Sequence, residues 1–142
     1  MTTYISVPAV TYETAARIVA IALELATAAG VRGVVSVVDP AMQLVAFGRA
    51  DGASPHSVET SRRKADTAAS TRRPSKAMRA DLAVALEHGS GGRLTSIAGG
   101  VPLAFDGVHV GGLGVAGGAP EQDAKIATAA LAIIEADTED AR

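Results

Sequence analysis

A cluster of basic side chains in the middle of the chain has the composition of an anion-binding site. Arg62, Arg63 and Lys64 are consecutive, and Arg93 follows a glycine-containing loop. Guanidinium groups bind carboxylates and phosphates through paired hydrogen bonds. Two interpretations are open: a solvated helix face that acidic neighbours partly neutralise, or a site for a carboxylate, a phosphate or a haem propionate.

Three side chains on the same stretch could move a proton. Helical spacing places Lys64 at the edge of an apolar face, where a partly buried amine could bind an anion or, with a lowered pKa, act as a base. A lysine that extends its amine to solvent fits the same position. His56 and Glu59 lie near the start of this helix. If the protein is an enzyme, Lys64, His56 and Glu59 are its candidate catalytic groups.

The histidines are candidate ligands for haem iron but do not form a zinc motif. His56, His88 and His109 show no i,i+4 pair and no His-Glu-x-x-His pattern, so a preformed zinc site is not supported. His88 precedes Gly89, where a cation complements the end of a helix. His109 should face solvent, a second subunit or a ligand. His56 and His109 are therefore the candidate metal ligands.

The glycine-rich stretch 99–118 predicts a β-hairpin that another group approaches closely. Asp106 and Gly107 separate two apolar runs, which favours a type I′ turn. Several glycines in one strand indicate that another backbone or a ligand comes very near. Backbone N–H groups at such places could stabilise an anion or an enolate. The candidate ligand-binding glycines are Gly99, Gly100, Gly117 and Gly118.

The remaining patterns predict an α+β fold. Apolar periodicity indicates helices over residues 12–29, 55–73, 75–89 and 121–136, with Thr11, Ser54 and Ser75 as N-caps. Apolar runs indicate strands over 34–38 and 43–48, before the later hairpin. We expect an antiparallel sheet of about four to five strands flanked by helices, in the order α-β-β-α-α-β-β-α. Residues 1–142 should form a single domain, with flexible ends at about 1–10 and 137–142.

Composition argues against several classes of protein. The 142-residue chain has no cysteine, which excludes thiolate catalysis, disulfides and Cys-ligated metals. A net charge of -2 and an aromatic content of 3% argue against a nucleic-acid partner. No signal-peptide pattern and no membrane-spanning segment are evident. We expect a cytoplasmic protein with no membrane partner.

The order of several short motifs resembles the GlcG/HbpS-like family. The resemblance extends from about Thr11 to Leu131. Each motif is weak alone, but the ordered set is specific. Ala41 and Met42 depart from it, because the family often has a pair of glycines there. The motifs are Val37-Val38-Asp39, Lys64-Ala65-Asp66-Thr67-Ala68, Gly99-Gly100-Val101-Pro102, Gly111-Gly112-Leu113-Gly114-Val115 and Glu121-Gln122-Asp123.

The resemblance implies a profilin-like sheet and a homo-oligomer built from dimers. Some members bind haem, some are described as haem-degrading or redox-sensing, and a related domain is fused to corrinoid adenosyltransferases. It implies a small homo-oligomeric ligand-binding protein, with haem as the expected ligand. Lys64, with Arg62 or Arg63, would bind the propionates, and His56 or His109 would be the iron ligand.

A cofactor-independent enzyme is the alternative function. It would be an isomerase, a tautomerase or a lyase that transfers a proton on a small carboxylated metabolite. Arg93 or Arg62 would bind the carboxylate of that metabolite. The low aromatic content favours such a small polar substrate over a porphyrin, which needs apolar and aromatic walls.

Overall fold

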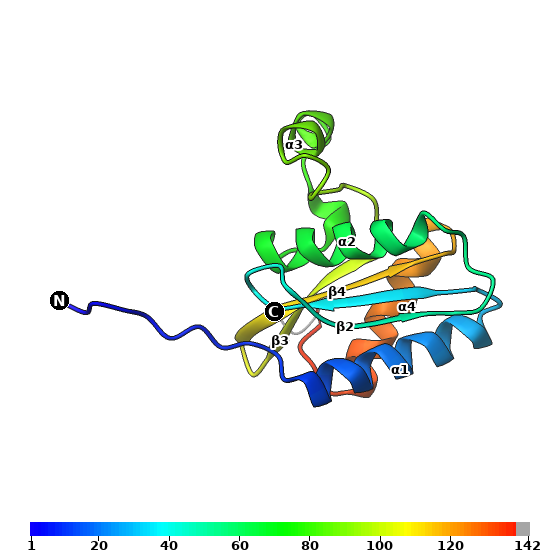
Figure 1. The fold of residues 1–142 in the computed structure, drawn as a ribbon, viewed down its shortest axis with the longest axis horizontal. Helices are drawn as coiled ribbons and strands as arrows, with labels where there is room; N and C mark the ends of the chain where they lie inside the picture. Colours follow the sequence, from blue (N-terminus) through cyan, green and yellow to red (C-terminus); the bar gives the residue numbers. More distant parts are fainter. Residues whose placement is uncertain (139–142) are drawn as a thin grey trace.

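A four-stranded antiparallel sheet lies between two helical layers (Figure 1). The computed structural model describes residues 1–138 and places the strands in the order β2-β1-β4-β3. Both predicted hairpins are present, and the predicted α+β fold and element order are confirmed. The strands are β1 (Val34–Val38), β2 (Leu44–Arg49), β3 (Gly100–Phe105) and β4 (Val108–Ala116).

Two helices cover one face of the sheet and a single helix covers the other (Figure 1). The paired helices α1 (Tyr12–Ala28) and α4 (Pro120–Ile133) enclose the main core with the sheet. Helix α2 (Ser57–Thr71) lies on the opposite face, against β4, β1 and β3. The short helix α3 (Ala83–Gly89) stands away from both layers at the end of an arm (Figure 1).

Short sequence motifs explain where α1 begins and how the hairpin of β3 and β4 turns. The Oγ1 of Thr11 accepts a hydrogen bond from the N–H of Thr14 at 3.2 Å, which confirms the predicted N-cap. Asp106 and Gly107 have φ values of 52° and 79°. Two successive positive φ values define the predicted type I′ turn.

Two predicted helix boundaries were wrong. Helix α2 begins at Ser57, with His56 as N-cap, because Ser54 and Pro55 form a preceding turn instead. The predicted helix over residues 75–89 is divided into a 3₁₀ turn (Ser75–Ala77) and α3. Met78 is extended, with ψ 134°, and α3 has no buried residue, so no packing holds the segment in one continuous helix.

Glycines on β4 allow the backbone of α2 to rest directly on the sheet. A Cβ at Gly114 would collide with the Ser61 carbonyl oxygen and lie 2.6 Å from the Ala65 nitrogen. A Cβ at Gly112 would collide with the Ala65 carbonyl oxygen. The close approach predicted from the glycines is therefore made by a helix backbone of the same chain.

The two ends of the described chain differ in their contacts. Residues 1–9 are exposed and lead away from the domain (Figure 1). At the other end, the Asp137 carboxylate accepts hydrogen bonds from the N–H groups of Asp106 and Gly107, at 3.1 and 2.8 Å. Residues 139–142 lie outside the described part.

Within the described part, none of the helices is both long and apolar enough to cross a membrane.

Replacing Gly114 by alanine tests the packing of α2 on β4. The added methyl group must displace the α2 backbone, so we expect a loss of about 1 to 3 kcal/mol of unfolding free energy. Urea denaturation followed by circular dichroism measures it. Gly89→Ala is the matched control, because a Cβ there meets no atom within 4 Å. An unchanged midpoint for Gly114→Ala would contradict this packing.

Candidate functional site

An apolar groove lies beside α2, because this helix leaves β2 largely uncovered. Leu44 and Phe47 point to the α2 side of the sheet and remain 47% and 41% exposed. Beneath them, the hydroxyl groups of Ser36 and Ser61 are 2.7 Å apart. The β2 groove encloses about 240 Å³ and is lined by Ser36, Leu44, Phe47, Val58, Glu59 and Arg62.

A polar hollow adjoins the β2 groove and shares Glu59 and Arg62 with it. It lies between α2 and the loop that returns from α3. This arginine pocket encloses about 220 Å³ and is lined by Glu59, Arg62, Arg63, Asp66, Gly91, Gly92 and Arg93. The structure therefore brings together Arg62, Arg63 and Arg93, which the sequence predicted as ligand-binding residues.

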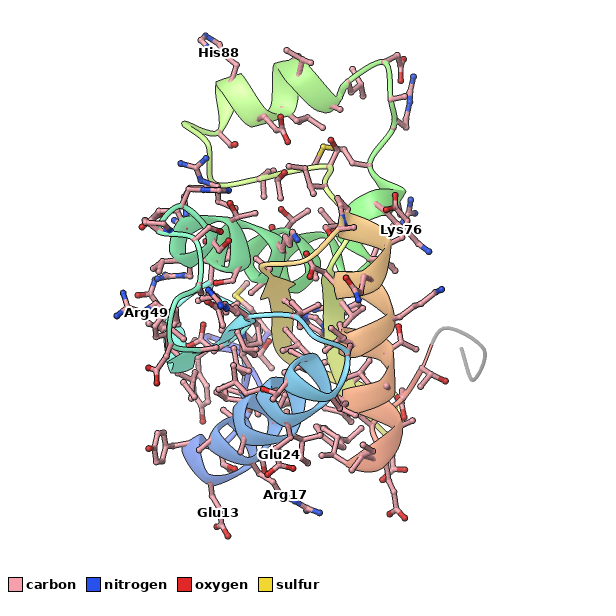
Figure 2. All side chains as sticks on the ribbon, turned by 90° about the vertical axis from the view of Figure 1, so that its right-hand side faces the viewer. Glu13, Arg17, Glu24, Arg49, Lys76 and His88 are labelled. Atoms are coloured by element: carbon pink, nitrogen blue, oxygen red, sulfur yellow. The ribbon has the colours of Figure 1, made fainter. Side chains whose placement is uncertain are left out.

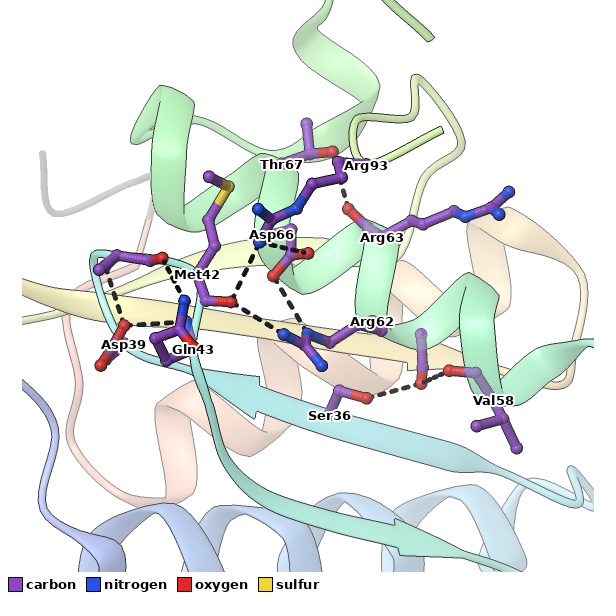
Figure 3. Close-up of polar contacts among 12 residues, drawn as sticks. Ser36, Asp39, Met42, Gln43, Val58, Arg62, Arg63, Asp66, Thr67 and Arg93 are labelled. Carbon is purple, nitrogen blue, oxygen red and sulfur yellow. Dashed lines mark hydrogen bonds and ion pairs between the residues drawn. The ribbon is translucent and has the colours of Figure 1, made fainter. Parts of the chain in front are cut away.

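Two of these guanidinium groups are held by the same two acceptors (Figure 3). Arg62 donates to the carbonyl oxygen of Met42 at 2.9 Å, and Arg93 donates to the same oxygen at 3.3 Å. Asp66 accepts from Arg62 Nε at 3.3 Å and lies 3.7 Å from Arg93 Nη2. The first hairpin turn and one carboxylate thus orient both arginines.

Met42 presents its carbonyl because the turn has an unusual backbone conformation. Its φ is 62°, in the left-handed region that favours glycine. This conformation fits the pair of glycines that the family resemblance leads us to expect at residues 41–42. The Asp39 carboxylate supports the turn by accepting from the N–H groups of Ala41 and Gln43, at 2.9 and 3.0 Å.

Asp66 is a buried carboxyl group with a perturbed proton affinity. Only 3% of the residue is exposed. Burial raises its pKa above 3.8, although the charges of Arg62 and Arg93 and their hydrogen bonds oppose the change. The pocket contains three guanidinium groups and two carboxyl groups, so it favours an anionic ligand.

Lys64 is buried away from both hollows. Its Nζ donates to Asp123 Oδ2 at 3.0 Å and to the Val115 carbonyl at 2.9 Å. The other oxygen of Asp123 accepts from Gly118 N–H at 2.9 Å. Burial lowers the pKa of Lys64, and the neighbouring carboxylate of Asp123 acts in the opposite direction. This ion pair joins α2 to the first turn of α4.

The histidines occupy three different environments. His109 Nε2 lies 2.8 Å from the carbonyl oxygen of Ala69, so the ring contacts α2. His56 is exposed at the start of α2, two residues before Val58 of the β2 groove. His88 lies at the far end of the arm (Figure 2).

None of the four predicted ligand-binding glycines lines the β2 groove or the arginine pocket. A Cβ at Gly99 would lie 2.8 Å from Lys64 Nζ, and one at Gly100 would collide with the Lys64 carbonyl. A Cβ at Gly117 would collide with the Arg32 carbonyl, and Gly118 donates to Asp123. These glycines make room for the chain itself.

Sequence reasoning missed the residues that shape the site. Leu44 and Phe47 are part of an ordinary apolar strand, and only the short reach of α2 exposes them. In the sequence, Asp66 and Asp123 stand out only as members of the family motifs, and neither motif shows which cation the carboxylate meets. No local pattern connects Lys64 with a partner 59 positions away.

The sheet, its helical layers and the matched sequence define the class of protein. The family described as "Haem degrading protein HbpS-like" matches residues 10–132, so the chain belongs to this family. No curated protein matches the chain significantly.

Solved structures agree in fold and in sequence. A double mutant of HbpS from Streptomyces reticuli is 31% identical, with a TM-score of 0.83 over 94% of this chain and 92% of that one. The "PduOC:Heme Complex" is 30% identical, with a TM-score of 0.84 over 92% and 98%. Klebsiella pneumoniae ORFY is 28% identical, with a TM-score of 0.85 over 97% and 99%.

Breaking the buried ion pair should destabilise the fold strongly. Lys64→Met leaves the Asp123 carboxylate buried without its cation, so we expect a loss of about 3 to 5 kcal/mol in urea denaturation. The double variant Lys64→Met/Asp123→Leu should lose less than the sum of the single variants. Arg79→Gln is the control: its ion pair with Asp81 is exposed and should contribute less than about 1 kcal/mol. Additive losses would contradict the coupling.

The raised pKa of Asp66 predicts a pH dependence of stability. The folded protein binds this proton at a higher pH than the unfolded chain does. The contribution of Asp66 to stability is therefore largest below its unfolded pKa and falls as pH rises from 3.8 to the raised value. Asp66→Asn should flatten this part of a stability curve measured by thermal unfolding at successive pH values. An identical slope in wild type and variant would contradict it.

Proposed function

We propose that this protein binds haem in the β2 groove and the arginine pocket. The observation that carries the proposal is that an apolar groove adjoins a cationic pocket, with Glu59 and Arg62 lining both. A haem has an apolar macrocycle and two propionates, so its two parts match the two parts of this site. Membership of the HbpS-like family and the similarity to a haem complex of PduOC support the same ligand.

Each part of the site would hold a different part of the ligand. Leu44, Phe47 and Val58 would contact the macrocycle, and burial of this apolar surface would supply most of the affinity. Arg62 and Arg93, already oriented by Met42 and Asp66, would bind a propionate without paying much further ordering entropy. Arg63 would reach the second propionate.

His56 is the more accessible of the two candidate iron ligands. It is exposed at the N-cap of α2, three residues before Glu59, which lines both hollows, whereas the Nε2 of His109 lies 2.8 Å from the Ala69 carbonyl oxygen. His109 would have to release this contact before it could bind iron. Bound haem would supply redox chemistry at its iron, and a neutral imidazole is a common ligand for that metal.

A proton-transfer enzyme is the second candidate, and one observation favours it. Glu59 lines the arginine pocket together with Arg62 and Arg93. The arginines could bind the carboxylate of a small metabolite while Glu59 accepts a proton from it. Lys64 is a weaker candidate base, because Asp123 and Val115 occupy its amine.

We also infer a homo-oligomer built from dimers. The outer edge of β2 ends the sheet, and its strand carries the exposed Leu44 and Phe47. An apolar edge strand of this kind favours association with another chain. The cytoplasmic location inferred from the sequence remains a prediction, as does the oligomer, which analytical ultracentrifugation would test.

A haemin titration of the purified apoprotein tests the proposed function. We expect a saturable Soret change, and Arg62→Ala or Arg93→Ala should weaken binding about tenfold through the lost charge-assisted hydrogen bonds. His56→Ala should alter the Soret position. His88→Ala is the matched control, because His88 lies at the far end of the arm (Figure 2).

One result would count against haem in this site, and another would count against a histidine ligand. A featureless response without saturation would remove haem as the ligand and favour a screen of small carboxylic acids for proton exchange. Tight haem binding with an unchanged spectrum in a variant that lacks both His56 and His109 would remove the histidine ligand.

A further inference from the structure

A second hollow lies under the arm that carries α3 and shares no lining residue with the β2 groove or the arginine pocket. It encloses about 350 Å³, a volume within the range of small-molecule sites. Its walls come from the end of α2, the 3₁₀ turn, α3 and the returning loop. The apolar part is formed by Pro74, Ala77, Met78, Leu82, Leu86 and Leu94.

The apolar side chains of this arm groove are not used to build a core. Helix α3 has no buried residue, and Leu82 and Leu86 each remain 40% exposed. Apolar surface that stays gathered in a concave, solvent-exposed place is characteristic of a binding site.

Hydrogen bonds at the base of the arm hold the groove open. The Thr95 N–H donates to Thr67 Oγ1 of α2 at 2.8 Å, and Ser75 Oγ donates to the Ile97 carbonyl at 2.6 Å. Glu87 of α3 accepts from Thr95 Oγ1 at 2.7 Å and from the Ser96 N–H at 2.9 Å, and these two hydrogen bonds lower the pKa of Glu87. The arm is thus anchored to α2, and the groove exists before any ligand arrives.

The charge on the lining of the groove is positive. Arg73 and Arg79 both line it, and no acidic side chain does. Arg79 is paired with Asp81 at 2.6 Å. The guanidinium of Arg73, by contrast, forms no ion pair within residues 1–138, which leaves it available to an anion.

We propose that the arm groove binds an apolar monocarboxylate of the size of octanoate. Its hydrocarbon would lie among Met78, Leu82 and Leu86, and its carboxylate would pair with Arg73. A single carboxylate matches the single unpaired guanidinium, and the apolar walls match an unbranched chain. This site is independent of the proposed haem site.

Isothermal titration with octanoate, below its micelle concentration, tests the proposal. We expect saturable binding of about one molecule per chain. Arg73→Gln should weaken it about tenfold, because the charge-assisted hydrogen bonds to the carboxylate are lost. Octan-1-ol, which lacks the charge, should bind more weakly than octanoate and show no response to Arg73→Gln. Ala77→Phe should abolish binding by filling the groove.

Two variants separate this site from its surroundings. Arg72→Gln removes the neighbouring charge, which does not line the groove, and Arg62→Gln removes a charge from the arginine pocket. Both should bind octanoate like the wild type. Equal loss in Arg72→Gln, or no loss in Arg73→Gln, would overturn the proposal. Circular dichroism of each variant distinguishes lost binding from lost folding.

Haem titration of the same variants keeps the two proposals distinct. Arg73→Gln and Ala77→Phe should bind haem like the wild type. If Ala77→Phe loses haem and octanoate together, haem occupies the arm groove and the separate site is overturned. If haem fails to bind in every variant while octanoate still depends on Arg73, the proposed function fails and the arm groove stands.

Discussion

The contact between the backbone of α2 and the glycines of β4 is the constraint on which the rest of the structure depends. With no side chain between them, the helix cannot rise, rotate or slide without exposing the strand or colliding with it. Because α2 packs mainly on β4, it leaves β2 largely uncovered. The β2 groove is therefore a consequence of how α2 is seated, and not of any local feature of β2.

The same position of α2 determines which groups its other faces contact. Lys64 lies on the inward side and reaches Asp123, which ties the helix to α4 on the far side of the sheet. Arg62 and Asp66 lie on another side of α2, where Arg62 donates to the first hairpin turn. One helix thus separates a structural ion pair from the charged cluster of the arginine pocket, although Lys64 is only two positions from Arg62 and from Asp66.

The fold could be predicted from the sequence because its signals are local. Turn residues, apolar runs and an N-cap at Thr11 each depend on near neighbours, and together they gave the correct order of elements. Two of the predicted arginines, Arg62 and Arg63, are consecutive on α2, and Arg93 enters the same pocket from the loop that returns from α3. What could not be predicted depends on distant contacts: the burial of Lys64, the exposure of Phe47 and the interruption of the helix after Ala77. The periodicity of apolar residues indicates the type of a helix or strand, but it does not show which other element will pack against it.

The two serines beneath the β2 groove give its floor a polarity. The Ser61 hydroxyl has one proton, and it donates that proton to the Val58 carbonyl at 2.9 Å. When the Ser61 proton is on the Val58 carbonyl, Ser36 is the donor in its bond to Ser61, 2.7 Å away, and has no second proton to offer. To any molecule that reaches it, Ser36 can only accept. The floor of the β2 groove thus disfavours an anionic group, whereas the arginine pocket attracts one. The charges alone therefore orient a bound molecule, with its anionic end toward the arginines.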